Sequence, residues 1–123
     1  MRHNKDVGRK GEDIAAEYVD SLGMIILERN WHCSKAELDI IAIKDFTLRI
    51  IEVKSRNEEC SETISNSLDK KKLRQLEKGA AAYFSEHKIK GISDIYFDLI
   101  TVIFTQDGGY RIEYIPQFFY PSW

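Results

Sequence analysis

Two acids and a lysine stand in neighbouring apolar segments of this chain. Asp39 lies in AELDIIA, and Glu52 and Lys54 lie in LRIIEVKS, with only a short turn between the two segments. Carboxylate oxygens are the ligands that Mg²⁺ and Mn²⁺ prefer, so a bound cation would turn two like-charged side chains into a site. These three residues are therefore the candidate site, provided that the fold brings them together.

A β-hairpin would bring the acids together. If residues 45–46 form a two-residue loop, the antiparallel register opposes Asp39 to Glu52 and Glu37 to Lys54. Directly opposed side chains share one face of a sheet, so this register predicts a polar patch. The other face would carry four apolar residues, namely Leu38, Ile40, Ile51 and Val53. A slip of one residue would send Asp39 to the face opposite Glu52.

A solvated sheet face on which Glu37 pairs with Lys54 is the structural alternative to a metal site. The Glu-x-Lys pattern alone decides little, because it occurs again at residues 86–88, near the end of a predicted helix. Residues two apart on a helix point about 200° apart and cannot converge, so only the strand copy can form a site. Asp98, a single acid in the apolar segment YFDLITV, is expected to have a structural role, such as pairing with a buried arginine.

The composition places few limits on function. The chain has 123 residues, enough for one domain, and its 18 Lys and Arg against 20 Asp and Glu give a net charge of -2. There are two basic runs, one with Arg2, His3, Lys5, Arg9 and Lys10 and one with Lys70, Lys71, Lys72, Arg74 and Lys78. The two cysteines lack metal-ligand spacing, and there is no secretory signal or long apolar run. We therefore expect a reduced, cytoplasmic protein that does not enter a membrane.

The apolar pattern predicts a single α/β domain over residues 1–123. The expected elements, in chain order, are a helix at 4–22, a strand at 24–29, a connection at 30–35, the hairpin strands at 36–42 and 48–55, a polar loop at 56–66, a helix at 68–87 and strands at 94–104 and 110–115. Gly23 is placed to terminate the first helix, and Gly91 follows the end of the second.

Three further features concern the surroundings of the site. Glu12 lies on or beside the buried stripe of the first helix, and an acid that points inward needs a partner. The polar loop at 56–66 is either a lid or a connector. The aromatic tail at 116–123 is expected to pack back on the domain rather than to form a contact surface.

The chain resembles the YraN-like family of small bacterial proteins. Five segments carry the resemblance in order and spacing: GRKGEDIAAEYVDSLG, ILERNWHC, AELDIIA, IIEVKSR and YFDLITV. That family is regarded as a branch of the PD-(D/E)xK nuclease superfamily, close in fold to archaeal Holliday-junction resolvases. The resemblance covers residues 7–115 and implies a restriction-endonuclease-like core, a mixed five-stranded sheet flanked by helices in the order αβββαββ.

The resemblance also implies a nuclease site. Its acids fall on Glu12, Asp39 and Glu52 and its lysine on Lys54, and we expect Asp39, Glu52 and the carbonyl of Val53 to hold one Mg²⁺ or Mn²⁺. Lys54 would position a water, while Glu12 would either bind a second metal ion or orient a metal-bound water. The residues expected to contact DNA are Arg9, Lys10, Lys71, Lys72 and Arg74. Of these, Lys72 is the one that falls on a basic family position.

Two departures from the family pattern, Ala36 and Asp45 in place of glycines, touch none of these residues. Asp45 tolerates the left-handed backbone that such a turn needs.

The expected activity is metal-dependent hydrolysis of phosphodiester bonds in DNA, with branched or junction DNA among the candidate substrates. Two alternatives belong to other classes: a nucleic-acid-binding module without catalysis, and a protein-interaction domain on the same fold. Symmetric cutting of a four-way junction would require two copies of the chain, so a homodimer accompanies the nuclease interpretation.

Overall fold

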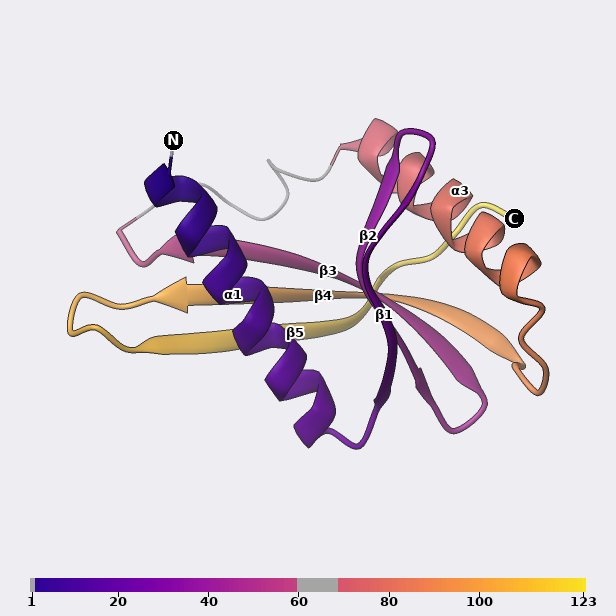
Figure 1. The fold of residues 1–123 in the computed structure, drawn as a ribbon, viewed down its shortest axis with the longest axis horizontal. Coiled ribbons are helices and arrows are strands. Elements are labelled where there is room, and N and C mark those ends of the chain that lie inside the picture. Colours follow the sequence, from indigo (N-terminus) through magenta and orange to yellow (C-terminus); the bar gives the residue numbers. More distant parts are fainter. Residues whose placement is uncertain (1, 60–68) are drawn as a thin grey trace.

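The chain folds into a five-stranded mixed sheet with two helices. The computed structural model describes residues 2–59 and 69–123, with side chains from Lys10 onward. Its elements are α1 (Arg2–Ser21), β1 (Ile25–Cys33), β2 (Ala36–Lys44), β3 (Thr47–Asn57), α3 (Lys70–His87), β4 (Asp94–Phe104) and β5 (Tyr110–Phe119). The strands lie in the order β1-β2-β3-β4-β5, and only β3 and β4 are parallel (Figure 1). The predicted α/β class and the order αβββαββ are confirmed.

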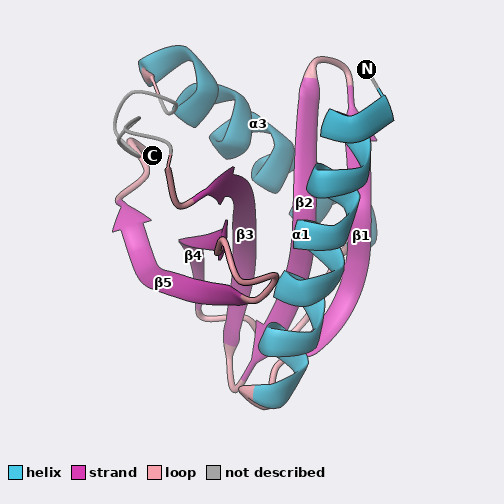
Figure 2. Ribbon diagram, turned by 90° about the vertical axis from the view of Figure 1, so that its left-hand side faces the viewer, coloured by secondary structure: helices cyan, strands magenta, loops and turns pink. Residues whose placement is uncertain are grey.

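The sheet separates two apolar cores, and each helix closes one of them (Figure 2). Ala15 and Val19 of α1 pack on Ile51, whereas Leu76 and Ala80 of α3 belong to the core on the other side. The middle strands are covered on both faces, so most of their residues are apolar, as in β4, whose sequence is DIYFDLITVIF.

Residues next to the helices fix where α1 ends and where α3 begins and ends. Gly23 adopts a positive φ of 84° after α1, as predicted for a helix terminator. Asp69 caps the start of α3, where its side chain accepts a hydrogen bond from the Lys72 N–H at 2.9 Å. The second helix ends at His87, as predicted, and Gly91 (φ 81°) follows its end. The cap of this helix is Lys88, which takes the left-handed conformation (φ 48°) and donates its N–H to the Phe84 carbonyl.

Both outer strands are longer than predicted. β1 continues through the segment expected to be a connection, pairs with β2 as far as Cys33 opposite Ala36, and leaves only a two-residue turn. The residues of this segment are mostly polar, so they lack the apolar alternation from which a strand is predicted. An edge strand can lack this pattern because its backbone still pairs with the neighbouring strand. β5 likewise passes Pro116 to reach Phe119, since an edge strand can accommodate a proline.

The aromatic tail packs back on the domain, as predicted. Phe118 and Phe119 lie against the core under α3, and the rings of Phe97 and Trp123 are 5.7 Å apart between centroids. Tyr120 and Trp123 nevertheless remain 79% and 61% exposed.

The β2–β3 hairpin has the predicted register. Asp45 (φ 55°) occupies its two-residue turn, and pairs run from Lys44 opposite Thr47 to Ile40 opposite Ile51. The ladder then stops, although β2 extends back to Ala36 and β3 extends on to Asn57. Beyond this point β2 stays with β1 and β3 stays with β4, so the sheet divides (Figure 1). We call this opening between β2 and β3, flanked by Asp39 and Glu52, the fork.

Two predictions about the strands at the fork differ from the structure. Leu38 was predicted to share a face with Ile40, but it packs in the core under α3 because β2 has turned away from β3. The polar loop predicted at 56–66 begins later, since β3 runs to Asn57, and residues 60–66 lie outside the described residues.

Candidate metal site at the fork

Asp39 and Glu52 form a pair of acids at the fork, in which Glu52 is buried and Asp39 is partly buried. Glu52 is only 2% exposed, and Asp39 accepts a hydrogen bond on Oδ2 from the Val53 N–H at 2.9 Å. Burial raises the pKa of Asp39 to about 8, and the charge of Glu52 and a hydrogen bond between the two side chains act in the same direction. The Val53 N–H and Lys72 oppose this rise in the pKa. Without a cation, the pair therefore retains a proton near neutral pH.

The two carboxylate oxygens of Glu52 have different partners. Its Oε2 lies 3.3 Å from Lys72 Nζ and 3.8 Å from Lys54 Nζ. Its Oε1 is buried and receives no hydrogen bond from the described N–H and O–H groups, unless Asp39 is protonated and donates to this carboxylate. A buried carboxylate oxygen without a partner is costly, so this position favours a proton or a cation.

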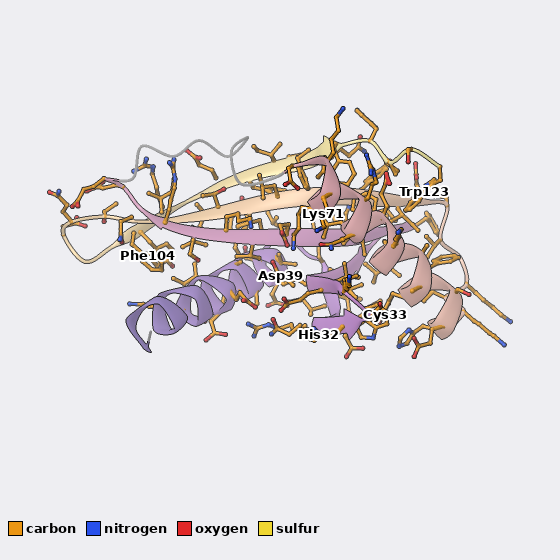
Figure 3. All side chains as sticks on the ribbon, turned by 90° about the horizontal axis from the view of Figure 1, so that it is seen from above. His32, Cys33, Asp39, Lys71, Phe104 and Trp123 are labelled. Atoms are coloured by element: carbon orange, nitrogen blue, oxygen red, sulfur yellow. The ribbon has the colours of Figure 1, made fainter. Side chains whose placement is uncertain are left out.

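The carboxyl of Glu12 approaches the fork from α1. Burial raises its pKa, and the negative charge of Asp39 is the next largest cause, while Arg29 lowers it. The preceding residue allows α1 to lie this close to β3, because a Cβ at Gly11 would be 1.8 Å from Ser55 Oγ. The inward acid predicted on the first helix is thus beside Asp39. Seen from above, Asp39 lies between α1 and α3 (Figure 3).

The donor atoms at the fork fit Mg²⁺ or Mn²⁺. In the described part of the chain, no three His, Cys, Asp or Glu side chains gather closely enough to hold a metal by themselves. This excludes a closed zinc-type cage among those residues, but Mg²⁺ is usually bound by one or two carboxylates with waters and phosphate oxygens. The Val53 carbonyl can add a donor, because the N–H and C=O of one strand residue point to the same edge and this N–H points to Asp39.

Glu37 takes no part in the fork. It was predicted to pair with Lys54, but the β2–β3 ladder ends before these residues meet. Glu37 is instead 3.8 Å from His32 across the β1–β2 pair, and Lys54 faces Glu52. The predicted Glu37–Lys54 pair is therefore wrong, whereas the lysine itself is at the site.

The predicted DNA-contacting residues lie in different places. Lys71 and Arg74 are exposed on α3 (Lys71 is labelled in Figure 3), and Lys10 lies exposed on α1 with Nζ 5.8 Å from the Phe104 ring centroid. The Arg9 side chain lies outside the described residues. Lys72 is only partly exposed because it reaches Glu52, a contact that the sequence does not signal, since it depends on how α3 crosses the fork.

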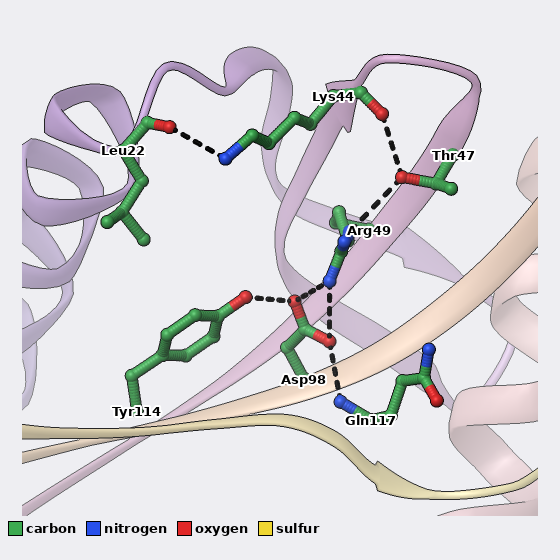
Figure 4. A network of polar contacts seen from close by, with 7 residues as sticks. All are labelled: Leu22, Lys44, Thr47, Arg49, Asp98, Tyr114 and Gln117. Carbon is green, nitrogen blue, oxygen red and sulfur yellow. Dashed lines mark hydrogen bonds and ion pairs between the residues drawn. The ribbon is translucent and has the colours of Figure 1, made fainter.

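Asp98 has the structural role expected of it. It is fully buried and receives three polar contacts (Figure 4): an ion pair with Arg49 Nη1 at 3.1 Å, a hydrogen bond from Tyr114 OH at 2.6 Å and one from the Gln117 N–H at 2.9 Å. Burial and the hydrogen bond to Asp98 raise the pKa of Tyr114. With its oxygens satisfied in this way, Asp98 ties β3, β4 and β5 together and is not a metal ligand.

Comparison with known proteins gives one consistent match. The profile of a family described as "Uncharacterised protein family UPF0102" matches residues 11–102. A UPF0102 protein of Parabacteroides distasonis is 36% identical over 120 residues, covering 98% of this chain and 97% of its own. One from Bacteroides thetaiotaomicron is 35% identical over 121 residues, covering 98% of each chain, and one from Acidothermus cellulolyticus is 34% identical over 118 residues, covering 89% of each. In the described residues, no helix combines the length and the apolar character needed to cross a membrane.

Proposed function

The chain belongs to the UPF0102 family of uncharacterised proteins, whose name assigns no activity, and from the geometry of the fork we propose that it is a divalent-metal-dependent deoxyribonuclease. Family membership confirms the resemblance to YraN-like proteins noted from the sequence. Membership of the PD-(D/E)xK superfamily remains part of the proposal, which therefore depends on the site itself.

The observation that carries the proposal is the Asp39–Glu52 pair with a buried, unpartnered oxygen on Glu52. Two acids brought together out of water weaken a fold, and apolar residues would fill the same space without that cost. The pair becomes favourable when a cation lies between the carboxylates. Two lysines at the other oxygen of Glu52 add positive charge where a phosphate would approach.

We assign the residues at the fork as follows. Asp39, Glu52 and the Val53 carbonyl would hold one Mg²⁺ or Mn²⁺, which would polarise the scissile phosphate and lower the pKa of a water. The Lys54 ammonium orients the attacking water and offsets the charge that builds up on the phosphate. Lys72, on the same carboxylate oxygen, fixes the orientation of Glu52. Glu12, whose pKa is raised by burial and by the charge of Asp39, would accept or return a proton of that water, because the three acids do not gather closely enough to share one metal ion.

The test is cleavage of three DNA substrates, a linear duplex, a flap and a four-way junction, with Mg²⁺ or Mn²⁺ and with EDTA. We expect cutting that requires the metal ion and is lost in Asp39→Asn and in Lys54→Ala. Glu17→Gln, which removes an exposed acid on α1, is the matched control and should cut like the wild type. Equal cutting by the wild type and Asp39→Asn would reject the site, and binding of DNA without cutting would favour a binding module that lacks catalysis.

A further inference from the structure

A positively charged hollow lies between the turn that joins β1 to β2 and one flank of α3. Its volume is about 170 Å³, and its lining residues are Cys33, Ser34, Lys35, Ala36, Gln75 and Lys78. Each wall contributes one lysine, and no acid lines the hollow. The walls meet closely because α3 has a glycine there: a Cβ at Gly79 would lie 3.0 Å from the Cβ of Ala36.

The lysines of the hollow have no protein partner. Within residues 10–59 and 69–123, neither Lys35 nor Lys78 makes an ion pair or a hydrogen bond, and the same holds for Lys71 and Arg74. Positions 71, 74 and 78 fall within about 60° of one another around a helix, so these side chains form one basic flank of α3 that ends at the hollow. Cations without internal partners are available to an external anion.

The second half of α1, on the other face of the sheet, carries the opposite charge. Its exposed acids are Asp13, Glu17 and Asp20, and of these only Asp13 has a basic partner among the described side chains, in Arg29. The bases of α1 lie in its first half, where the sequence has Arg2, Lys5, Arg9 and Lys10. A polyanion is therefore attracted to the basic flank of α3 and repelled by the second half of α1.

The distance from the hollow to the fork fits a nucleic-acid strand. Lys72 contacts Glu52 in the first turn of α3, and Lys78 follows six positions later, which is about 9 Å along the helix axis at about 1.5 Å per residue. Along the axis of duplex DNA one strand advances about 3.4 Å per nucleotide, so about 9 Å corresponds to between two and three nucleotides for a duplex whose axis runs along α3. The volume of the hollow suits one phosphate group with waters around it.

We propose that this hollow binds a backbone phosphate of the DNA strand, two to three nucleotides from the bond that is cut at the fork. The inference rests on the proposed nuclease function for the position of the cut, and on the hollow alone for the binding of phosphate. Lys35 and Lys78 supply the charge, while the Ser34 hydroxyl and the Gln75 amide can donate hydrogen bonds to phosphate oxygens. Contacts of this kind position a strand without reading its sequence.

The experiment measures DNA binding in EDTA, where nothing is cut, at salt concentrations from about 50 to 200 mM. It compares the wild type with Lys35→Ala/Lys78→Ala and with the control Lys88→Asn/Lys90→Ala, which also removes two unpartnered lysines but does not touch the hollow; asparagine suits the left-handed backbone at Lys88. Losing one phosphate contact should lower the slope of log K against log salt by about 0.9 on duplex and about 0.7 on single strands, and weaken binding about 3-fold to 10-fold in low salt. The control should keep the wild-type slope.

Equal slopes in the hollow variant and the control would overturn the inference. The inference would also be overturned if the wild type bound inorganic pyrophosphate but bound neither duplex nor single-stranded DNA. The anion held in the hollow would then not be a phosphate of a DNA strand. Cleavage, measured separately, tells the two proposals apart. If the hollow variant changes the salt slope but the wild type cuts no DNA, the phosphate site is supported and the nuclease function is rejected. If the wild type cuts DNA but the slopes are equal, the nuclease function is supported and the phosphate site is rejected.

Discussion

Replacing Asp39 by asparagine should remove most of the pH dependence of stability that the fork creates. The pKa of Asp39 is raised from 3.8 to about 8 in the folded protein. Between these values the folded state holds a proton that the unfolded state has lost, so the free energy of unfolding falls as pH rises through this window. Asparagine keeps the carbonyl that accepts the Val53 N–H and can donate to Glu52, but it does not titrate.

The size of the effect follows from the shift in the pKa. About four pKa units at about 1.4 kcal/mol each give an upper limit of about 6 kcal/mol, of which about 4 kcal/mol falls between pH 5 and pH 8. Water that enters the fork lowers this value, so we expect the wild type to lose about 2 kcal/mol or more over that range relative to Asp39→Asn. At pH 8 and without metal ions, the variant should be the more stable protein.

The assay is urea unfolding followed by circular dichroism in EDTA at pH 5, 6, 7 and 8. Glu17→Gln, on the exposed face of α1, controls for the loss of one acid. The comparison between variants removes the contribution of groups that do not interact with Asp39. Glu12 belongs with Asp39 in the measured difference, because the charge of Asp39 raises its pKa. The reasoning is refuted if Asp39→Asn and Glu17→Gln follow the same pH profile as the wild type.

Three further predictions concern the same network and its support. Mn²⁺ at ten times its Kd should stabilise the wild type by about 1.4 kcal/mol in thermal unfolding and should not stabilise Asp39→Asn. Its apparent affinity should be weaker at pH 6 than at pH 8, because protons compete for the carboxylates. Stabilisation of Asp39→Asn by Mn²⁺ would contradict the assigned ligands. Lys72→Met should lower stability more at pH 8 than at pH 5, because Lys72 opposes the rise in the pKa of Asp39 and so favours its ionised form, and a uniform loss in urea unfolding would show that Lys72 acts by packing alone. Asp98→Ala should cost about 3 kcal/mol or more, because Arg49 is left without its counter-charge, and a loss below about 1 kcal/mol would contradict the structural role of Asp98.

The sequence predicts the centre of the fold better than its edges. The two-residue turn at Asp45 fixes the register of the hairpin, and that register brings Asp39 close to Glu52. Local periodicity also locates β4 over the range found in the structure. These features depend on neighbours along the chain, which is why one sequence is enough to predict them.

Other features depend on packing between distant segments. Alternation predicts that Leu38 and Ile40 share a face, and it fails because the two strands part after Ile40, which no local pattern encodes. The contact of Lys72 with Glu52 and the hollow beside Lys78 both depend on the path of α3 over the hairpin. The sequence could indicate that α3 is basic but not which lysine enters the site.

The fork has a mechanical consequence. Asp39 belongs to the β1–β2 hairpin and Glu52 to the β3–β4–β5 sheet, and no strand pairing spans the gap at these residues. Two contacts therefore hold the acids together: the Val53 N–H donates to Asp39 across the gap, and α3 packs on the hairpin where Gly79 meets Ala36. A larger residue at Gly79 would push the hairpin away from α3 and disturb the spacing of the acids. The affinity for the proposed metal ion would thus be adjustable from a residue that touches neither acid.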